Sequence, residues 1–113
     1  MGTIFDKILA REIPAAIVFE DEHVLAFKDI HPQARVHVLV IPKRRAESLH
    51  DMARMKPEHV GEFMAAITRV ASHLGLHEGG YRVVFNTGKD AGQTVFYVHA
   101  HILGGEALSG FGR

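Results

Sequence analysis

The chain of 113 residues contains no cysteine. This absence excludes disulfide bonds, thiolate metal sites and a cysteine nucleophile. Because small secreted domains usually need such cross-links, it also favours a reducing, cytoplasmic location. Charge of one sign is not in excess either, since 13 lysines and arginines balance 13 aspartates and glutamates. The composition therefore gives no support to a nucleic-acid partner.

Long apolar runs are missing as well. No stretch approaches the roughly 20 apolar residues of a membrane span. Charged side chains also interrupt any signal-peptide core within the first 20 residues. We therefore expect no membrane partner. The hydrophobic fraction of 47% is enough for one core, so a single domain over residues 1–113 is predicted.

The hydrophobic pattern predicts an α+β domain. Thr3 can cap a short helix that Pro14 closes, and a long helix runs from Pro57 to Gly75 on apolar residues spaced three and four apart. A further short helix is expected around 46–52, and 106–113 form an irregular tail. Strands are expected at 16–20, 23–27, 36–41, 81–85 and 93–105. This order indicates an antiparallel sheet of about five strands with helices on one face. Its remaining face or edge lacks a partner, which indicates a homodimer.

Two histidines stand two residues apart in the last of these strands. Alternate strand residues share a face, so His99 and His101 are expected side by side, roughly 6–7 Å apart at the backbone. Imidazole changes charge near neutral pH and acts as base, acid, nucleophile or metal ligand. With His37 on an earlier strand, the pair indicates a catalytic site. The alternative is that each ring is half-buried and bonded only to backbone.

The loop that precedes this strand is rich in hydrogen-bond donors. Residues 86–94 include the Asn86 amide, the Thr94 hydroxyl and the backbone of Gly92. Such a concavity suits phosphate oxygens, although glycine and asparagine are also ordinary turn residues. A donor-rich loop leading into a histidine pair favours phosphoryl or nucleotidyl transfer. One imidazole must then be neutral, with its second nitrogen held by a backbone carbonyl, and His99 is the candidate.

A metal site is the rival interpretation of the histidines. His37, His99 and His101 could supply three nitrogen ligands to zinc or iron. No nearby carboxylate is positioned as an obvious fourth ligand or base, so we predict no metal and no other cofactor. The other histidines are expected at the surface or in loops, namely His23, His31, His50, His59, His73 and His77.

The segment from Gly92 to Gly105 resembles the signature of the histidine triad (HIT) superfamily. The resemblance extends to 4–8, 12–15, 27–34 and 37–43, and so spans residues 3–105. The Ile4-Phe5 opening and the Leu103-Gly104-Gly105 ending are most similar to the Hint branch, the purine nucleoside phosphoramidases. The resemblance implies a HIT fold and an AMP-binding homodimer whose two sheets join.

The resemblance also implies roles for individual residues. His99 matches the family nucleophile, which attacks the α-phosphorus to give a nucleotidyl-histidine that water hydrolyses. His101 matches the residue that contacts the phosphate and the scissile atom, His37 a supporting histidine, and Asp29 the ribose-binding acid. The phosphate loop is matched by Asn86, Gly92, Gln93 and Thr94, and an apolar slot for the base by Ile4, Phe5, Ile8, Ile13, Phe27, Ile30 and Leu39. From their apolar character alone, these seven residues would be assigned to the core.

The chain departs from the family pattern at three places. Tyr97 stands where the first histidine of H-x-H-x-H is usual, in a supporting catalytic position, and tyrosine can still donate a hydrogen bond. Residues 106–113 lack the tryptophan-proline segment with which Hint proteins often reach the partner's site. In the phosphate loop, Thr94 replaces the usual serine but keeps its hydroxyl.

The sequence therefore favours a hydrolase or transferase that cleaves AMP or GMP from its leaving group. The favoured target is the P–N bond of a purine nucleoside phosphoramidate. Two alternatives remain open: a dinucleoside polyphosphate hydrolase, and a nucleotide-binding interaction module whose catalysis Tyr97 weakens.

Overall fold

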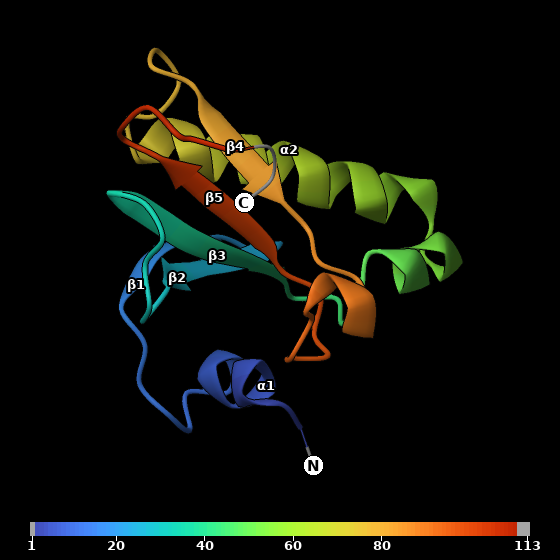
Figure 1. Ribbon diagram of the computed structural model, residues 1–113. Coiled ribbons are helices and arrows are strands. Elements are labelled where there is room, and N and C mark those ends of the chain that lie inside the picture. Colours follow the sequence, from blue (N-terminus) through green and yellow to red (C-terminus); the bar gives the residue numbers. More distant parts are fainter. Residues whose placement is uncertain (1, 111–113) are drawn as a thin grey trace.

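Five strands form one antiparallel sheet in the computed structural model, which describes residues 2–110 (Figure 1). The strand order is β1-β2-β3-β5-β4. The strands are β1 (Ile17–Glu20), β2 (Val24–Lys28), β3 (Val36–Pro42), β4 (Tyr81–Val84) and β5 (Ala100–Gly104). The helices are α1 (Ile4–Leu9) and α2 (Pro57–His73), with 3-10 turns η1 (His50–Arg54) and η2 (Lys89–Ala91). The predicted α+β class and the five-stranded antiparallel sheet are confirmed.

The two α-helices lie on opposite faces of the sheet, so the expectation that they share one face is wrong (Figure 1). Phe63, Ile67 and Val70 of α2 pack with one set of alternating strand residues, among them Val24, Ala26, Val38, Val40, Ala100 and Ile102. The intervening residues Leu25, Phe27, Leu39 and Ile41 pack with Phe5 and Ile8 of α1. Because successive strand residues point to opposite faces, the unbroken apolar runs of β2 and β3 required cover on both sides.

Each helix has a local reason to begin where it does. Thr3 caps α1, since its hydroxyl accepts the backbone N–H groups of Phe5 and Asp6, and the Asp6 carboxylate accepts the Thr3 N–H in return. Pro57 occupies the first turn of α2, where its missing N–H costs nothing.

Among residues 2–110, neither helix has the length and apolar character to cross a membrane.

The predicted strand over 93–105 is only half realised. Pairing with β3 begins at Ala100, opposite Val40, and residues 93–99 form a bent segment outside the sheet. The Val98 N–H donates to the Ala46 carbonyl at 2.7 Å, which draws this segment away from the β3 ladder. His99 therefore lies at the point where the chain enters the sheet.

The bounds of β1 to β4 differ by one residue from the expected ones, whereas α1 ends at Leu9, well before Pro14, which was expected to close it. The first hairpin turns over three residues, because the Asp21 carboxylate accepts the N–H groups of both His23 and Val24. The short helix expected at 46–52 is η1, a 3-10 turn that begins later. The described part of the tail, residues 106–110, contains neither helix nor strand. The rest of the predicted tail lies outside the described residues.

Candidate active site

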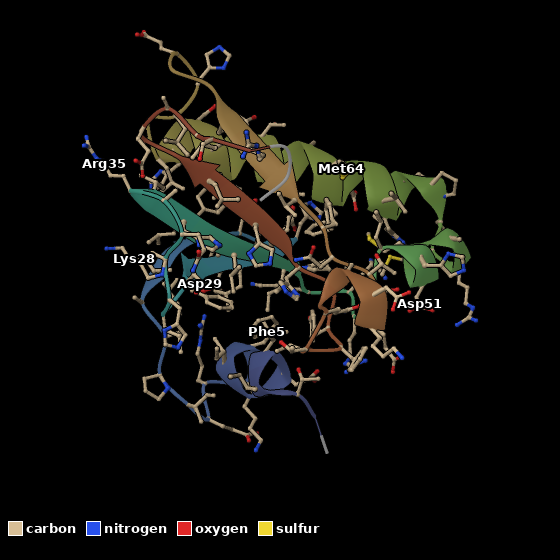
Figure 2. All side chains as sticks on the ribbon, in the orientation of Figure 1. Phe5, Lys28, Asp29, Arg35, Asp51 and Met64 are labelled. Carbon is tan, nitrogen blue, oxygen red and sulfur yellow. The ribbon has the colours of Figure 1, made fainter. Side chains whose placement is uncertain are left out.

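A pocket of 620 Å³ lies between α1 and the sheet. Figure 2 shows Phe5 between this helix and the strands. All seven residues of the predicted base slot line it: Ile4, Phe5, Ile8, Ile13, Phe27, Ile30 and Leu39. Asp29, Thr94, His99 and His101 line the same pocket. An apolar slot with a few convergent polar groups is the usual form of a small-molecule site.

Ile30 and Ile4 are exposed large hydrophobic members of this lining. The Ile30 side chain is 84% exposed and Ile4 49% exposed, whereas Phe5 and Ile8 are buried. The slot is therefore a groove with a core-like floor and an open apolar rim. A flat aromatic ring could be covered by such a rim when bound, because burial of apolar surface favours binding.

His99 is held in one orientation from two sides. Its Nδ1 lies 2.7 Å from the Tyr97 carbonyl oxygen. A carbonyl only accepts, so Nδ1 carries the proton and Nε2 of the neutral ring has a free lone pair. The ring of Phe5 contacts His99 edge-on, with centroids 4.9 Å apart. Within residues 2–110, Nε2 makes no hydrogen bond.

His37 and His101 form a directed hydrogen-bond chain. The Gln33 backbone N–H donates to His37 Nδ1 at 3.0 Å. His37 Nδ1 is thus an acceptor, and in the neutral ring the proton sits on Nε2, which lies 2.9 Å from His101 Nδ1. His101 accepts there, so its own proton sits on Nε2. The site therefore has a lone pair on His99 Nε2 and, beside it, an N–H donor on His101 Nε2. The centroids of these two rings lie 5.1 Å apart.

Burial keeps all three rings neutral. Burial is the main cause that lowers the pKa of His37 and of His99, although Asp29 opposes it in both cases. The pKa of His101 is lowered to about 4 by burial and by the neighbouring His99 and His37. At neutral pH the site therefore contains an uncharged nucleophile candidate, which a charged imidazolium could not be.

Asp29 joins the histidines to the rim of the pocket. One carboxylate oxygen accepts the His31 N–H at 2.7 Å, which fixes the turn after β2. The other oxygen lies 3.4 Å from His37 Nε2. A carboxylate placed between the histidines and an apolar slot is suited to accept hydrogen bonds from hydroxyl groups.

A metal ion could be ligated by Asp29, His37 and His101, whose ligand atoms lie within 4.8 Å of one another. The expectation that no carboxylate stands near the histidines is therefore wrong. However, His37 Nε2 and His101 Nδ1 are joined by a hydrogen bond. A cation would have to displace the proton between them, since metal ligands must be deprotonated.

The predicted phosphate loop is only partly directed at the pocket. Thr94 lines the pocket, and within residues 2–110 its hydroxyl and N–H have no partner. Gly92 donates its N–H to the Lys89 carbonyl, so it is not the free donor expected. The Gly92 backbone is left-handed, with φ of 81°, which favours glycine. Neither Gly92 nor Asn86 lines the pocket.

Gln93 has a scaffolding position. Its side chain is buried; the amide oxygen accepts the Gly88 N–H, and the amide nitrogen donates to the carbonyls of Glu47 and Val95. All three bonds connect backbone segments, so no part of this amide faces the pocket. Gln93 holds the loop from which Thr94 projects.

Comparisons with known proteins agree with this geometry. A profile of the HIT domain matches residues 10–108. The chain is 48% identical over 107 residues to an uncharacterized HIT-like protein of Synechococcus elongatus, covering 95% of this chain and 93% of that protein. It is 41% identical over 106 residues to the purine nucleoside phosphoramidase of Escherichia coli K12, covering 94% and 89%. The chain belongs to the HIT family.

A solved HIT structure confirms the fold. The HIT family hydrolase from Clostridium thermocellum superposes with a TM-score of 0.87 at 42% identity, covering 96% of this chain and 95% of that one. The predicted membership of the histidine triad superfamily and the predicted hydrolase class are thereby confirmed.

Tyr97 is where this HIT chain departs from the H-x-H-x-H pattern. The Tyr97 side chain is 1% exposed and packs with Phe5, Leu25 and Ile41 below the pocket. Its hydroxyl donates to the Pro42 carbonyl, and burial raises its pKa to about 12. It does not line the pocket, so its contact with the three site histidines is the backbone carbonyl that holds His99.

Several contributors to the HIT site were not predicted. Pro14, Ala15, Ala16, Lys28 and Val95 also line the pocket. Pro14 and Ala15 lie in the segment 12–15, which resembles the family, so the sequence already placed them next to the slot residue Ile13. Arg45, which contacts both α1 and the segment before His99, had no such signal, because a single arginine in a charged stretch usually indicates a solvated surface.

Proposed function

We propose that the protein cleaves purine nucleoside phosphoramidates through a nucleotidyl-histidine intermediate on His99. The observation that carries the proposal is the fixed tautomer of His99: Nδ1 bonded to a carbonyl, and a neutral Nε2 free beside the pocket. This is the state in which imidazole attacks an electrophile. The similarity to an Escherichia coli purine nucleoside phosphoramidase supports the choice of substrate.

The reaction follows from the two ring nitrogens that face the pocket. The Nε2 lone pair of His99 forms a bond to the α-phosphorus, and the bond from phosphorus to the leaving nitrogen breaks. The departing amine takes a proton from His101 Nε2, and His37 supports the ring that gives it. Water then attacks the phosphorus of the adduct and gives one proton back to His101 Nε2, the bond from phosphorus to His99 Nε2 breaks, and the nucleoside monophosphate is released with both histidines restored.

The rest of the pocket provides binding contacts. The purine lies in the apolar slot between α1 and the sheet, and the ribose hydroxyls donate to the Asp29 carboxylate. The phosphate oxygens accept hydrogen bonds from the Thr94 hydroxyl and N–H. Donors placed where negative charge develops stabilise the transition state, and this arrangement needs no metal ion.

Two other activities are compatible with the same residues. A dinucleoside polyphosphate also offers an α-phosphorus to His99, and comparing its cleavage with that of adenosine phosphoramidate separates the two substrates. A metal-dependent reaction at Asp29, His37 and His101 would be lost on chelation, whereas we expect chelation to leave turnover unchanged.

The decisive experiment replaces the nucleophile. We expect His99→Gly to lower turnover of adenosine phosphoramidate by at least about 10³-fold, because the covalent step is lost. AMP should still bind, since the slot is intact. Mass spectrometry of wild-type protein quenched during turnover should find a nucleotide adduct on His99.

The matched control is His77→Ala, which removes an exposed histidine in the turn after α2. It should keep full turnover. Wild-type rates in His99→Gly, or an adduct on another residue, would disprove the assignment.

We also propose that two copies form a dimer with a joined sheet. The outer edge of β4 has no strand beside it in the described chain, and its residues are only half-buried. An unpaired edge of this kind is a template for pairing with a second strand.

A further inference from the structure

Arg45 connects three segments around the candidate active site. Its Nε lies 2.9 Å from Asp6 Oδ1, and its Nη2 lies 3.2 Å from Asp6 Oδ2, in the paired geometry that suits a carboxylate. The same Nη2 donates to the Phe96 carbonyl at 3.2 Å. The guanidinium carbon also lies 5.3 Å from the centre of the Tyr97 ring. Arg45 thus contacts both α1 and the bent segment before β5.

One route from Arg45 to His99 runs along the backbone. Arg45 holds the carbonyl of Phe96, and the next carbonyl, that of Tyr97, holds His99 Nδ1. Residues 93–99 lack strand pairing, so two contacts outside the sheet set the orientation of the Tyr97 carbonyl. In its own peptide unit the Val98 N–H donates to the carbonyl of Ala46, the residue after Arg45, and one peptide earlier Arg45 holds the Phe96 carbonyl. If the peptide turned, the proton on Nδ1 would lose its acceptor and the ring could adopt the other tautomer.

A second route runs through α1. Asp6 follows Phe5, whose ring contacts His99 edge-on and whose helix forms one wall of the pocket. α1 has only six residues, too few for a helix that is stable alone. Figure 1 shows α1 below the sheet and next to the orange segment that leads into β5. The pair between Asp6 and Arg45 fastens this wall to that segment.

We propose that Arg45 is a positioning residue that sets both the His99 ring and the nucleotide-binding wall of α1. This inference rests on the proposed function, but it assigns a role outside the histidines and outside the pocket lining. The pairing with Arg45 is the main cause that lowers the pKa of Asp6 to about 2, so both groups remain charged throughout any practical assay. A lysine could keep the charge but could not reach Asp6 and Phe96 together with a planar fork.

The test is a kinetic comparison of three variants. Arg45→Met, which removes both routes, should lower kcat/KM about 10- to 100-fold, as expected when reacting groups lose their alignment. Asp6→Asn, which leaves the bond to Phe96 in place, should raise KM while kcat stays within about threefold of wild type. The matched control is Arg69→Met: Arg69 pairs with Asp21 and is similarly exposed, but does not line the pocket.

A second readout needs no substrate. Imidazole ¹⁵N shifts distinguish the two neutral tautomers, and the wild-type protein should show His99 with the proton on Nδ1. Arg45→Met should show a mixture, and Arg69→Met should match wild type. If Arg45→Met does not fold, kcat/KM and the His99 tautomer are measured in Arg45→Lys instead.

The outcomes separate the two proposals. Retained turnover in His99→Gly would disprove the proposed function. The tautomer of the His99 ring in Arg45→Met, measured without substrate, would still test the role of Arg45. An unchanged His99 tautomer together with kcat/KM within about twofold of wild type in Arg45→Met would overturn the positioning role.

Discussion

At the scale of single residues, protonation is set by backbone groups with fixed roles. The Gln33 N–H can only donate and the Tyr97 carbonyl can only accept, so each fixes one ring nitrogen of a histidine. The hydrogen bond between His37 and His101 transmits this choice to the pocket. A lone pair on His99 and an N–H on His101 follow from these contacts, without any charged neighbour being needed.

Tyr97 gives a prediction at the same scale. In Tyr97→Phe the Pro42 carbonyl loses its buried donor, which should lower the free energy of unfolding by about 1–3 kcal/mol. The backbone carbonyl that holds His99 remains, so kcat should stay near the wild-type value. Urea unfolding and steady-state kinetics measure the two effects separately.

The variant Tyr97→His tests the hypothesis that this tyrosine has weakened catalysis. A large gain in rate would show that the present chain is impaired, as an interaction module would be. We expect no such gain, because the Tyr97 side chain lies outside the pocket.

At the scale of elements, the site is assembled where regular structure ends. His99 precedes β5, Asp29 follows β2, and Thr94 follows η2. Loop ends leave backbone groups free to hold side chains, whereas the sheet interior uses those groups for pairing. β3 and β5 supply His37 and His101 from within the sheet, where their pairing fixes the distance between them.

The edge strand β4 gives the prediction for this scale. If β4 pairs with its copy, sedimentation should report twice the chain mass of 12.5 kDa. The outward amides of β4 should then exchange slowly with solvent, because they are bonded across the interface. β1, the other edge of the sheet, is an internal control and should exchange fast on its outer side. A monomer mass, or equally fast exchange at both edges, would contradict the dimer.

At the scale of the whole molecule, the three histidines make folding sensitive to acid. Their pKa values are lowered in the folded protein below the ordinary 6.5, that of His101 to about 4. The unfolded chain therefore binds more protons between these pH values, and stability rises with pH across this window. The contribution of the three neutral histidines to the free energy of unfolding is fully present above pH 6.5 and is lost as the pH falls toward 4.

We expect the free energy of unfolding to drop by on the order of 2 kcal/mol between pH 7.5 and pH 4.5, allowing for solvent screening. Urea unfolding at intermediate pH values measures it. The carboxylates of Asp6, Glu20 and Asp21 have lowered pKa values and titrate mainly below this range. His101→Asn removes one titrating ring while keeping an acceptor for His37, so its stability should depend less on pH. An equal slope in both proteins would rule out His101 as a source.

Much of the architecture was readable in the sequence because it depends on local spacing. The apolar residues of α2 recur at helical intervals, and Thr3 with Asp6 forms a capping box. The motif around His99 and His101 and the apolar slot residues were identified because their order along the chain resembles a known family. Helix spacing and caps are local, and the family pattern is an order of residues along the chain, so a linear sequence contains both.

What the linear pattern could not decide depends on contacts between distant residues. Ala46 draws the 93–99 segment out of the sheet, Glu47 and Gly88 engage the Gln93 amide, and Gln33 fixes the tautomer of His37. The placement of α1 opposite α2 is also a tertiary result: the apolar runs of β2 and β3 require cover on both faces, but which helix covers which face is decided by packing. The sequence by itself determined which side chains are available for chemistry. Only the tertiary structure decided which nitrogen carries each proton, because that is set by hydrogen bonds whose partners come together on folding.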